Sequence, residues 1–141
     1  MIISIGTDHT GFQIKENLVK HLKKMKYIVK DNGTFSEESC DYPDYAHTVC
    51  EQILEEASDF GILICGTGIG MSICANRMEG IRAALCTNEF MAEKARRHNN
   101  ANILVLGAKI NDEQSCKKML DIFLSEKFDG GRHTARLKKI S

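Results

Sequence analysis

The sequence predicts an α/β protein built around a five-stranded parallel sheet. Short apolar runs alternate with helix-length segments along the 141 residues, which is the order of repeated strand–helix–strand units. The clearest run, GILIC at residues 61–65, is continuously apolar, as in a strand that is covered on both faces, and three glycines follow it at alternate positions. This length suits one domain, so residues 1–141 are expected to fold as a single unit.

Each element follows from local periodicity. The expected strands are residues 2–5, 27–31, 61–65, 81–86 and 103–106. The expected helices are residues 10–25, 45–57, 69–78, 89–97 and 112–127, and the only proline, Pro43, falls where a helix can start. In the first helix Leu18 and Leu22 share the apolar side, whereas Lys15 and the other lysines are expected to face solvent.

Composition excludes several classes of function. Lys plus Arg and Asp plus Glu number 19 each, so no net charge favours a nucleic acid or an anionic membrane as partner. No apolar run approaches the ~20 residues that cross a bilayer. The six cysteines lack CxxC spacing and the N-terminus lacks a signal-peptide pattern, so we expect a reduced, cytoplasmic protein. Because HxxxH, HxH and paired CxxC motifs are missing, a metal site would need scattered ligands, and no metal is expected.

The segment CGTGIG at residues 65–70 predicts an anion-binding loop. Gly66, Gly68 and Gly70 permit positive φ angles and a close approach of ligand to bare backbone. A helix that starts near Gly70 would direct free N–H groups and the positive end of its dipole at that ligand. A thiol in such a place tends to ionise, so Cys65 is a candidate base or nucleophile.

The strand ends predict which side chains share a crevice with this loop. Ligands of open parallel sheets bind beyond the carboxyl ends of the strands. We therefore expect convergence of Asp8 and His9 after the first strand, Tyr42 from the long irregular segment 33–44, and Cys65 with Thr67 after the third. A simple capping or turn-bonding role for His9 remains an equal alternative, and the other cysteines are interpreted as structural.

Alternatives from other classes remain at this point. GTGIG is not the nucleotide motif GxGxxG and follows the third strand, and GK[ST] is missing. A phosphate or nucleotide-binding module without catalysis would still need only this loop and the C-terminal arginines. Arg132 and Arg136 lie one helical turn apart after a double glycine. They can form one face that binds a phosphate, or they can belong to a solvated basic tail. Considered alone, His98 is interpreted as a residue that marks the C-terminal end of a helix.

Six ordered blocks connect the chain to one family. They are TDHTGF at 7–12, DYPDYA at 41–46, ICGTGIGMSICANR at 64–77, GIRAALC at 80–86, RRHNNANILVLG at 96–107 and GGRHTAR at 130–136. Together they resemble the ribose-5-phosphate isomerase B family, which includes galactose-6-phosphate isomerase subunits. The resemblance implies a Rossmann-like three-layer α/β/α sandwich, a homodimer with shared active sites or a tetramer, and interconversion of ribose 5-phosphate and ribulose 5-phosphate without metal or cofactor.

The resemblance also implies roles for individual residues. Cys65 matches the base that moves the substrate proton, and His98 the group that opens the sugar ring. Thr67 with the loop amides suits the developing enediolate oxygen. The positions that match substrate contacts, or that we expect to make them, are Asp8, His9, Tyr42, Gly66, Thr67, Gly68, Ile69, Gly70, Asn99, Lys109, Arg132 and Arg136. Lys109 stands where the family commonly has arginine, which keeps the charge but loses the planar fork. Six-carbon substrates such as allose or galactose 6-phosphate remain an alternative.

Chain direction predicts how these residues assemble. His98 and Asn99 precede the fifth strand and therefore lie at the amino edge of the sheet, whereas Cys65 lies at the carboxyl edge. A strand of about five residues is about 17 Å long, so one chain does not readily bring His98 to its own Cys65. We expect a two-fold dimer in which residues from about 130 to 141 pack on the partner.

Overall fold

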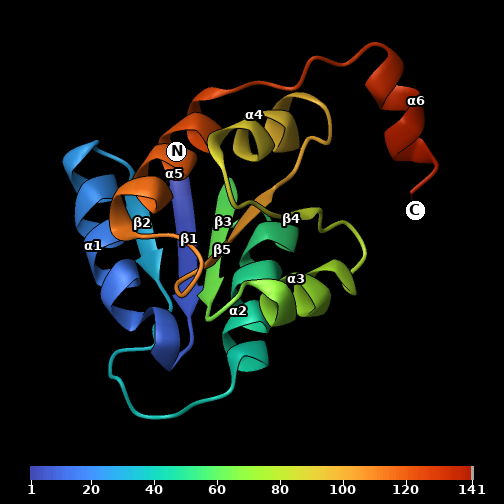
Figure 1. Ribbon diagram of the computed structural model, residues 1–141. Coiled ribbons are helices and arrows are strands. Elements are labelled where there is room, and N and C mark those ends of the chain that lie inside the picture. Colours follow the sequence, from blue (N-terminus) through green and yellow to red (C-terminus); the bar gives the residue numbers. More distant parts are fainter. Residues whose placement is uncertain (141) are drawn as a thin grey trace.

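The computed structural model describes residues 1–140, and its centre is a parallel five-stranded sheet (Figure 1). The strands are β1 (Ile2–Thr7), β2 (Ile28–Asp31), β3 (Phe60–Cys65), β4 (Ala83–Leu85) and β5 (Ile103–Gly107), in the spatial order β2-β1-β3-β5-β4. In register, Ile62 of β3 lies between Ile5 of β1 and Leu104 of β5. The predicted α/β class with a five-stranded parallel sheet is confirmed.

Two helical layers cover the sheet, as the predicted sandwich requires. One face carries α1 (Phe12–Lys24), α4 (Glu89–Arg97) and α5 (Glu113–Ser125), and the other carries α2 (Tyr42–Leu54) and α3 (Ile69–Asn76). Alternation along β3 divides its side chains: Ile62 and Ile64 pack under the first group, and Leu63 and Cys65 under the second. Cys65 therefore faces α2 and α3.

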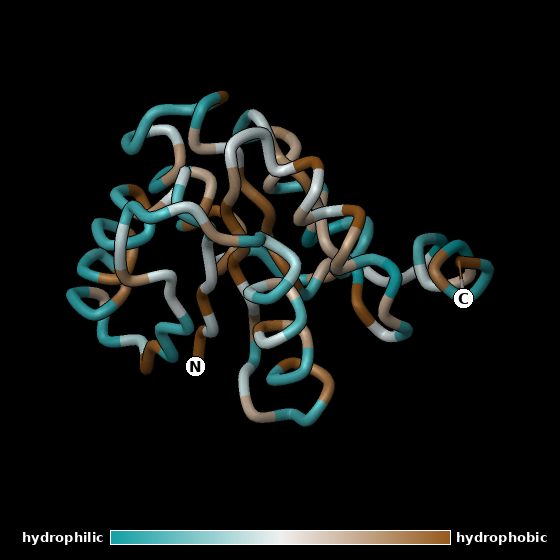
Figure 2. The backbone as a smooth tube through the Cα atoms, turned by 90° about the horizontal axis from the view of Figure 1, so that it is seen from below, coloured by the Kyte–Doolittle hydropathy of each residue, from teal (hydrophilic) through white to brown (hydrophobic). Residues whose placement is uncertain are grey.

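Helix α6 (Arg132–Lys138) stands apart from these layers. It lies at the upper right of Figure 1, beyond the amino ends of the strands, and it also projects from the molecule in Figure 2. Figure 2 shows the contrast with the centre, where brown, apolar strands are surrounded by helices with teal outer turns. Residues 126–131, between α5 and α6, form no helix or strand, so α6 is attached through an extended connection.

Every expected strand and helix is present, but some boundaries differ. Helix α2 begins at Tyr42, three residues before the expected start, and Pro43 lies in its first turn, where a missing N–H costs nothing. Tyr42 is therefore a helical residue and not part of the long loop. Strand β4 is limited to Ala83–Leu85, because Ile81 N–H bonds to Met78 O in the preceding turn.

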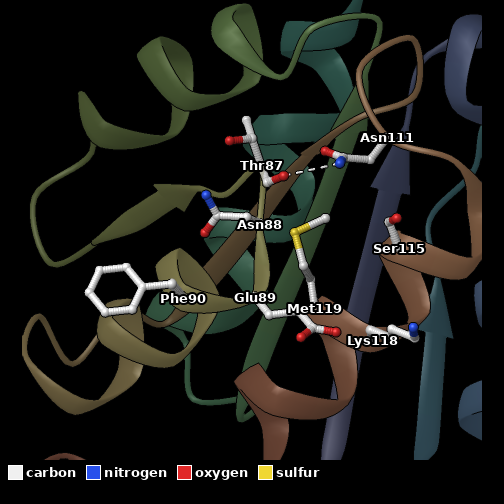
Figure 3. A pocket seen from close by; sticks show the side chains of 8 residues that line it. All are labelled: Thr87, Asn88, Glu89, Phe90, Asn111, Ser115, Lys118 and Met119. Atoms are coloured by element: carbon white, nitrogen blue, oxygen red, sulfur yellow. Dashed lines mark hydrogen bonds between the residues drawn. The ribbon is translucent and has the colours of Figure 1, made fainter.

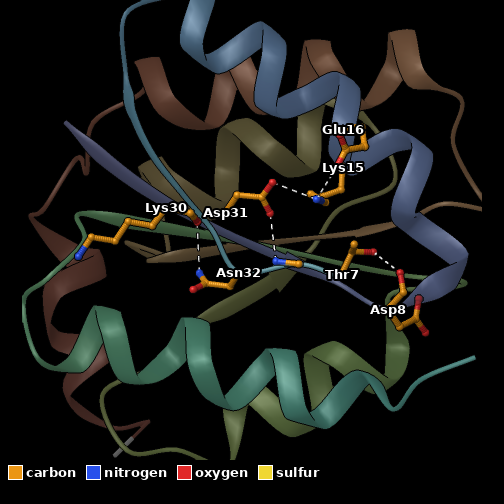
Figure 4. Close-up of polar contacts among 8 residues, drawn as sticks. Thr7, Asp8, Lys15, Glu16, Lys30, Asp31 and Asn32 are labelled. Carbon is orange, nitrogen blue, oxygen red and sulfur yellow. Dashed lines mark hydrogen bonds and ion pairs between the residues drawn. The ribbon is translucent and has the colours of Figure 1, made fainter. Parts of the chain in front are cut away.

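The expectation that Lys15 faces solvent is wrong. Its side chain has no exposed area, and Nζ lies 2.6 Å from a carboxylate oxygen of Glu16 and 3.0 Å from one of Asp31 (Figure 4). The ring of Phe35 lies 4.6 Å from the same ammonium. Asp31 also accepts the N–H of Gly33 at 3.0 Å, so this buried lysine ties α1 to the start of the long loop. Helical periodicity could not show this, because the carboxylate comes from β2.

All six cysteines are free. Burial raises the pKa of Cys50 and of Cys86 to about 12 and that of Cys116 to about 11, which fits their interpretation as structural residues. Residues 1–140 include no helix with the length and apolar character needed to cross a membrane.

Candidate functional site

A crevice of about 520 Å³ opens at the carboxyl edge of the sheet. Its lining residues are Asp8, Tyr42, Cys65, Gly66, Thr67, Ile69, Gly70, Ile73 and Lys109. Four of the five side chains that were expected to converge are among them. The fifth, His9, is not.

Cys65 is the last residue of β3 and is only 5% exposed. The backbone N–H of Gly68 donates a hydrogen bond to its Sγ at 3.2 Å. The next amide, of Ile69, donates to Thr67 Oγ1 at 3.2 Å and opens α3, at the residue where the expected helix 69–78 starts. The thiol thus lies under a turn from which one backbone N–H, that of Gly68, points toward it, just before the N-terminus of α3.

The three glycines of the loop differ in what their surroundings require. Only Gly68 has a positive φ, of 82°, and a Cβ there would lie 3.2 Å from the carbonyl of Leu106. At Gly70 a Cβ would lie 2.5 Å from the ring of Tyr42, so this glycine lets the tyrosine pack against α3. At Gly66 the nearest atoms would be 3.7 Å away, so neither reason applies. All three glycines permit a positive φ angle, as expected, but only Gly68 adopts one.

Asp8 and His9 separate at the end of β1. The carboxylate of Asp8 is buried, and Oδ1 accepts the N–H of Thr10 at 3.0 Å and its hydroxyl at 2.5 Å. His9 turns to the long loop instead, where its Nδ1 accepts the N–H of Cys40 at 3.2 Å. The neutral ring therefore carries its hydrogen on Nε2. This contact to a distant loop is neither the helix cap nor the bond within its own turn that formed the alternative interpretation of His9.

Lys109 brings a cation to the crevice from the same chain. Its backbone N–H donates to Gly66 O at 2.9 Å, which fixes the residue beside the glycine loop just after β5. Its side chain is exposed and lines the crevice. An ammonium here can attract an anionic group without the geometric constraint of a guanidinium.

The remaining predicted residues lie elsewhere. His98 caps the C-terminal end of α4, Asn99 follows it, and Arg132 and Arg136 lie on α6, all beyond the amino edge of the sheet. None of them lines the crevice of residues 1–140. Within one chain the structure therefore forms two separate groups, one around Cys65 and one around His98.

Two residues that the sequence did not single out complete the second group. The ring of His133 stacks on that of His98 with centroids 4.2 Å apart and planes at 14°. Burial lowers the pKa of His133, and the positive charges of His98 and Arg132 lower it further. Asp129 accepts a hydrogen bond from Arg97 Nε at 3.1 Å, and this bond lowers its pKa. Nothing in the spacing of residues 98, 129 and 133 indicates that they meet.

A second hollow, of about 420 Å³, lies between the first turns of α4 and α5 (Figure 3). Its residues include Thr87, Glu89, Asn111 and Lys118, and Asn111 Nδ2 donates to Thr87 O at 3.0 Å. It belongs to the helical layer opposite Cys65. None of the predicted site residues lines it, so we do not assign it to the site.

The fold and the crevice define an α/β protein with a glycine loop beside a buried thiol, and comparison with known proteins gives the family. The model of the Ribose/Galactose Isomerase family matches residues 3–140. A Rickettsia bellii protein with only the provisional name of sugar phosphate isomerase is 51% identical over 98% of this chain and 96% of its own.

Solved structures agree. Ribose 5-phosphate isomerase B from Thermotoga maritima superposes with a TM-score of 0.97 at 53% identity, covering 99% of this chain and 96% of that one. The enzyme of the same name from Mycoplasma genitalium, solved with bound ribulose-5-phosphate, gives 0.95 at 40% identity, with 99% and 93% covered. The chain belongs to the Ribose/Galactose Isomerase family, and the resemblance to ribose-5-phosphate isomerase B drawn from the six blocks is confirmed.

Proposed function

We propose that this protein interconverts ribose 5-phosphate and ribulose 5-phosphate through an enediolate, with Cys65 as the base. The observation that carries this proposal is the thiol of Cys65 under the amide of Gly68, at the floor of a crevice that also receives the Lys109 ammonium. Relatives over the whole chain that are named ribose-5-phosphate isomerase B support it.

The residues of the crevice supply what the proton transfer needs. The Cys65 thiolate takes the proton from C2 of the open-chain aldose and returns it to C1, and a proton moves from O2 to O1. The enediolate oxygen receives hydrogen bonds from the loop amides and Thr67. Preorganised donors of this kind are worth about 100- to 1000-fold in rate each. Asp8, Tyr42 and the segment from Gly66 to Gly70 surround the sugar.

We propose that His98 opens the furanose ring and that Asn99, Arg132 and Arg136, with His9 and Lys109, bind the substrate and its phosphate. His98→Ala tests the first role, because ribulose 5-phosphate cannot form the corresponding ring through its phosphorylated C5 oxygen. We expect a larger loss of initial rate from ribose 5-phosphate than from ribulose 5-phosphate. Equal losses in both directions would exclude ring opening as its role.

These roles require two copies of the chain, so we propose a homodimer with two composite sites. The separation of the two groups within one chain supports it, as does the detached position of α6. Ile69 and Ile73 beside the crevice are 54% and 57% exposed, as at a surface that another protein covers. A two-fold axis would place the His98 end of each chain over the Cys65 crevice of the other.

The six-carbon alternative is kept because the family name includes both ribose and galactose, and because the Rickettsia bellii relative is named only as a sugar phosphate isomerase, without a particular sugar. A crevice of about 520 Å³ falls within the usual range of small-molecule sites and does not discriminate one extra carbon. We therefore propose to compare kcat/KM for ribose 5-phosphate, allose 6-phosphate and galactose 6-phosphate with purified protein. A higher value for a six-carbon substrate would replace the proposed one, and turnover of none would leave only a binding module.

A further inference from the structure

Three residues from three segments converge at the amino edge of the sheet: His98, Asp129 and His133. One ligand atom from each lies within 4.8 Å of the other two. We propose that these residues bind a divalent transition-metal ion, for which Zn²⁺ is the reference, and that the bound ion inhibits the enzyme. The binding does not depend on the reaction, whereas the inhibition rests on the proposed role of His98.

The donor set indicates the class of ion. Two imidazoles and one carboxylate are ordinary ligands of Zn²⁺, and three protein ligands leave a fourth position for water. Imidazole-rich sites favour zinc, nickel, cobalt and copper, whereas magnesium and calcium prefer oxygen ligands alone. The group therefore fits a transition metal and not a magnesium–phosphate complex.

The carboxylate is already oriented. Asp129 receives Arg97 Nε on Oδ1 at 3.1 Å, and its backbone N–H donates to Arg97 O at 2.9 Å. These two contacts hold it beside the last turn of α4, which His98 caps. Because Arg97 bonds to Oδ1, Oδ2 can serve as the metal ligand. Partners of this kind orient a ligating carboxylate.

A small rearrangement would close the site. Bonds of about 2.0–2.1 Å in a tetrahedral site place the donor atoms about 3.4 Å apart, so the present separations of up to 4.8 Å must shorten. The stacked rings must also tilt, so that both lone pairs face the ion. His133 is the second residue of α6, which begins directly after Gly130 and Gly131 with φ angles of 69° and 55°. Since a Cβ on Gly131 would meet nothing within 4 Å, this connection has room to move.

Nearby positive charge limits the affinity. Arg97 bonds to the carboxylate, and Arg132 and Arg136 lie close enough to His133 to influence its charge. These guanidiniums repel a cation, so we expect micromolar and not nanomolar binding. Once bound, the ion occupies the lone pair of His98 that ring opening requires, and a chelator should reverse the inhibition.

Titration calorimetry with Zn²⁺, on the full-length protein without sugar and with a phosphine reductant, tests the site. We expect one ion per chain, and binding at least tenfold weaker in Asp129→Asn and in His133→Gln. His21→Gln is the matched control, because His21 Nε2 lies 2.7 Å from Asp121 in a histidine–aspartate pair elsewhere on the surface. Unchanged binding in both cluster variants would overturn the proposal.

The cysteines are the alternative ligands, and Co²⁺ distinguishes them. Nitrogen and oxygen ligands give visible d–d bands, whereas a thiolate adds an intense sulfur-to-cobalt band in the near ultraviolet. We expect d–d bands alone, lost in His133→Gln and kept in Cys65→Ser. An intense sulfur band that disappears in Cys65→Ser would assign the ion to the crevice and overturn the cluster as its site.

Activity then separates the two parts of the proposal. With ribose 5-phosphate, the wild-type rate should fall in proportion to the Zn²⁺ occupancy measured by calorimetry and return with EDTA. One bound ion with an unchanged rate would support the metal site and overturn the role of His98. Protein that binds Zn²⁺ but shows no isomerase activity even without the ion would support the site and refute the proposed function.

Discussion

The two edges of the sheet are built in different ways. At the carboxyl edge, Cys65 and the glycine loop are held by backbone: Cys65 O accepts from Ala108 N at 2.8 Å, and Gly66 O from Lys109 N at 2.9 Å. At the amino edge, His98 meets α6 through the ring stack with His133, and the ion pair between Arg97 and Asp129 ties the end of α4 to the extended segment before α6. The first group is preorganised by the core of its own chain, whereas the second has few contacts that fix it.

This difference suggests that the two edges of the sheet serve different steps of the proposed reaction. Proton transfer requires placement within a fraction of an ångström, which a strand end and a helix start provide. Phosphate binding and ring opening tolerate a group that arrives with a partner subunit or moves on a hinge.

Cys65→Ala should reduce turnover by about 100- to 10,000-fold, the usual contribution of a general base, and leave substrate affinity within a few-fold. The thiol acts on the carbon-bound proton and not on the phosphate. Steady-state kinetics and calorimetry with ribose 5-phosphate measure the two quantities. Cys74→Ala, on the same helix layer, is the control and should keep its activity. Near-normal turnover in Cys65→Ala would remove this residue as the base.

Mixing inactive Cys65→Ala with inactive His98→Ala protein should restore about a quarter of wild-type activity. After random exchange, half of the dimers are mixed, and each mixed dimer has one intact site of two. Exchange is followed with differently tagged subunits, and activity is measured before and after. If exchange is complete and no activity returns, or if a monomer is active at assay concentration, the two edges do not share a site.

Gly70→Ala should impair substrate binding more than Gly66→Ala. The new Cβ of Gly70→Ala would lie 2.5 Å from the Tyr42 ring, whereas that of Gly66→Ala would find its nearest neighbour at 3.7 Å. Overpacking costs about 1–3 kcal/mol, or roughly five- to a hundredfold in KM if the ring is displaced from the crevice. Kinetics of both variants decide the order. A larger effect at Gly66 would show that glycine is needed in this loop for contact with the ligand, and not for the packing of Tyr42.

Alkaline pH should weaken the core under the carboxyl edge. The thiols of Cys50, Cys86 and Cys116 ionise near 9.0 when unfolded but stay protonated to about 12, 12 and 11 when folded. Above pH 9 the folded state therefore binds more protons than the unfolded state, so the free energy of unfolding decreases as pH rises from 9 to 11. Urea unfolding at fixed pH values measures it. Cys86→Ala should show a shallower decrease, and an equal slope would assign the effect to other groups.

Local pattern determined most of the fold of this protein. Short apolar runs located all five strands, helix-length segments between them located the five helices of the layers, and chain direction placed Cys65 and His98 at opposite edges. Asp8, Tyr42, Cys65 and Thr67 followed from the single rule that strand ends share an edge. Such features depend on neighbours in sequence, so one sequence is enough to predict them.

Tertiary structure decided the features that depend on distant partners. Lys15 is buried because β2 supplies Asp31, and Gly70 must be small because Tyr42 packs on it. His9 binds the loop at Cys40, and Asp129 joins His98 and His133 only when α6 returns to the end of α4. Each of these contacts joins elements whose separation along the chain carries no periodic signal. Side-chain burial and close approach arise from packing in three dimensions, which spacing along one chain does not encode.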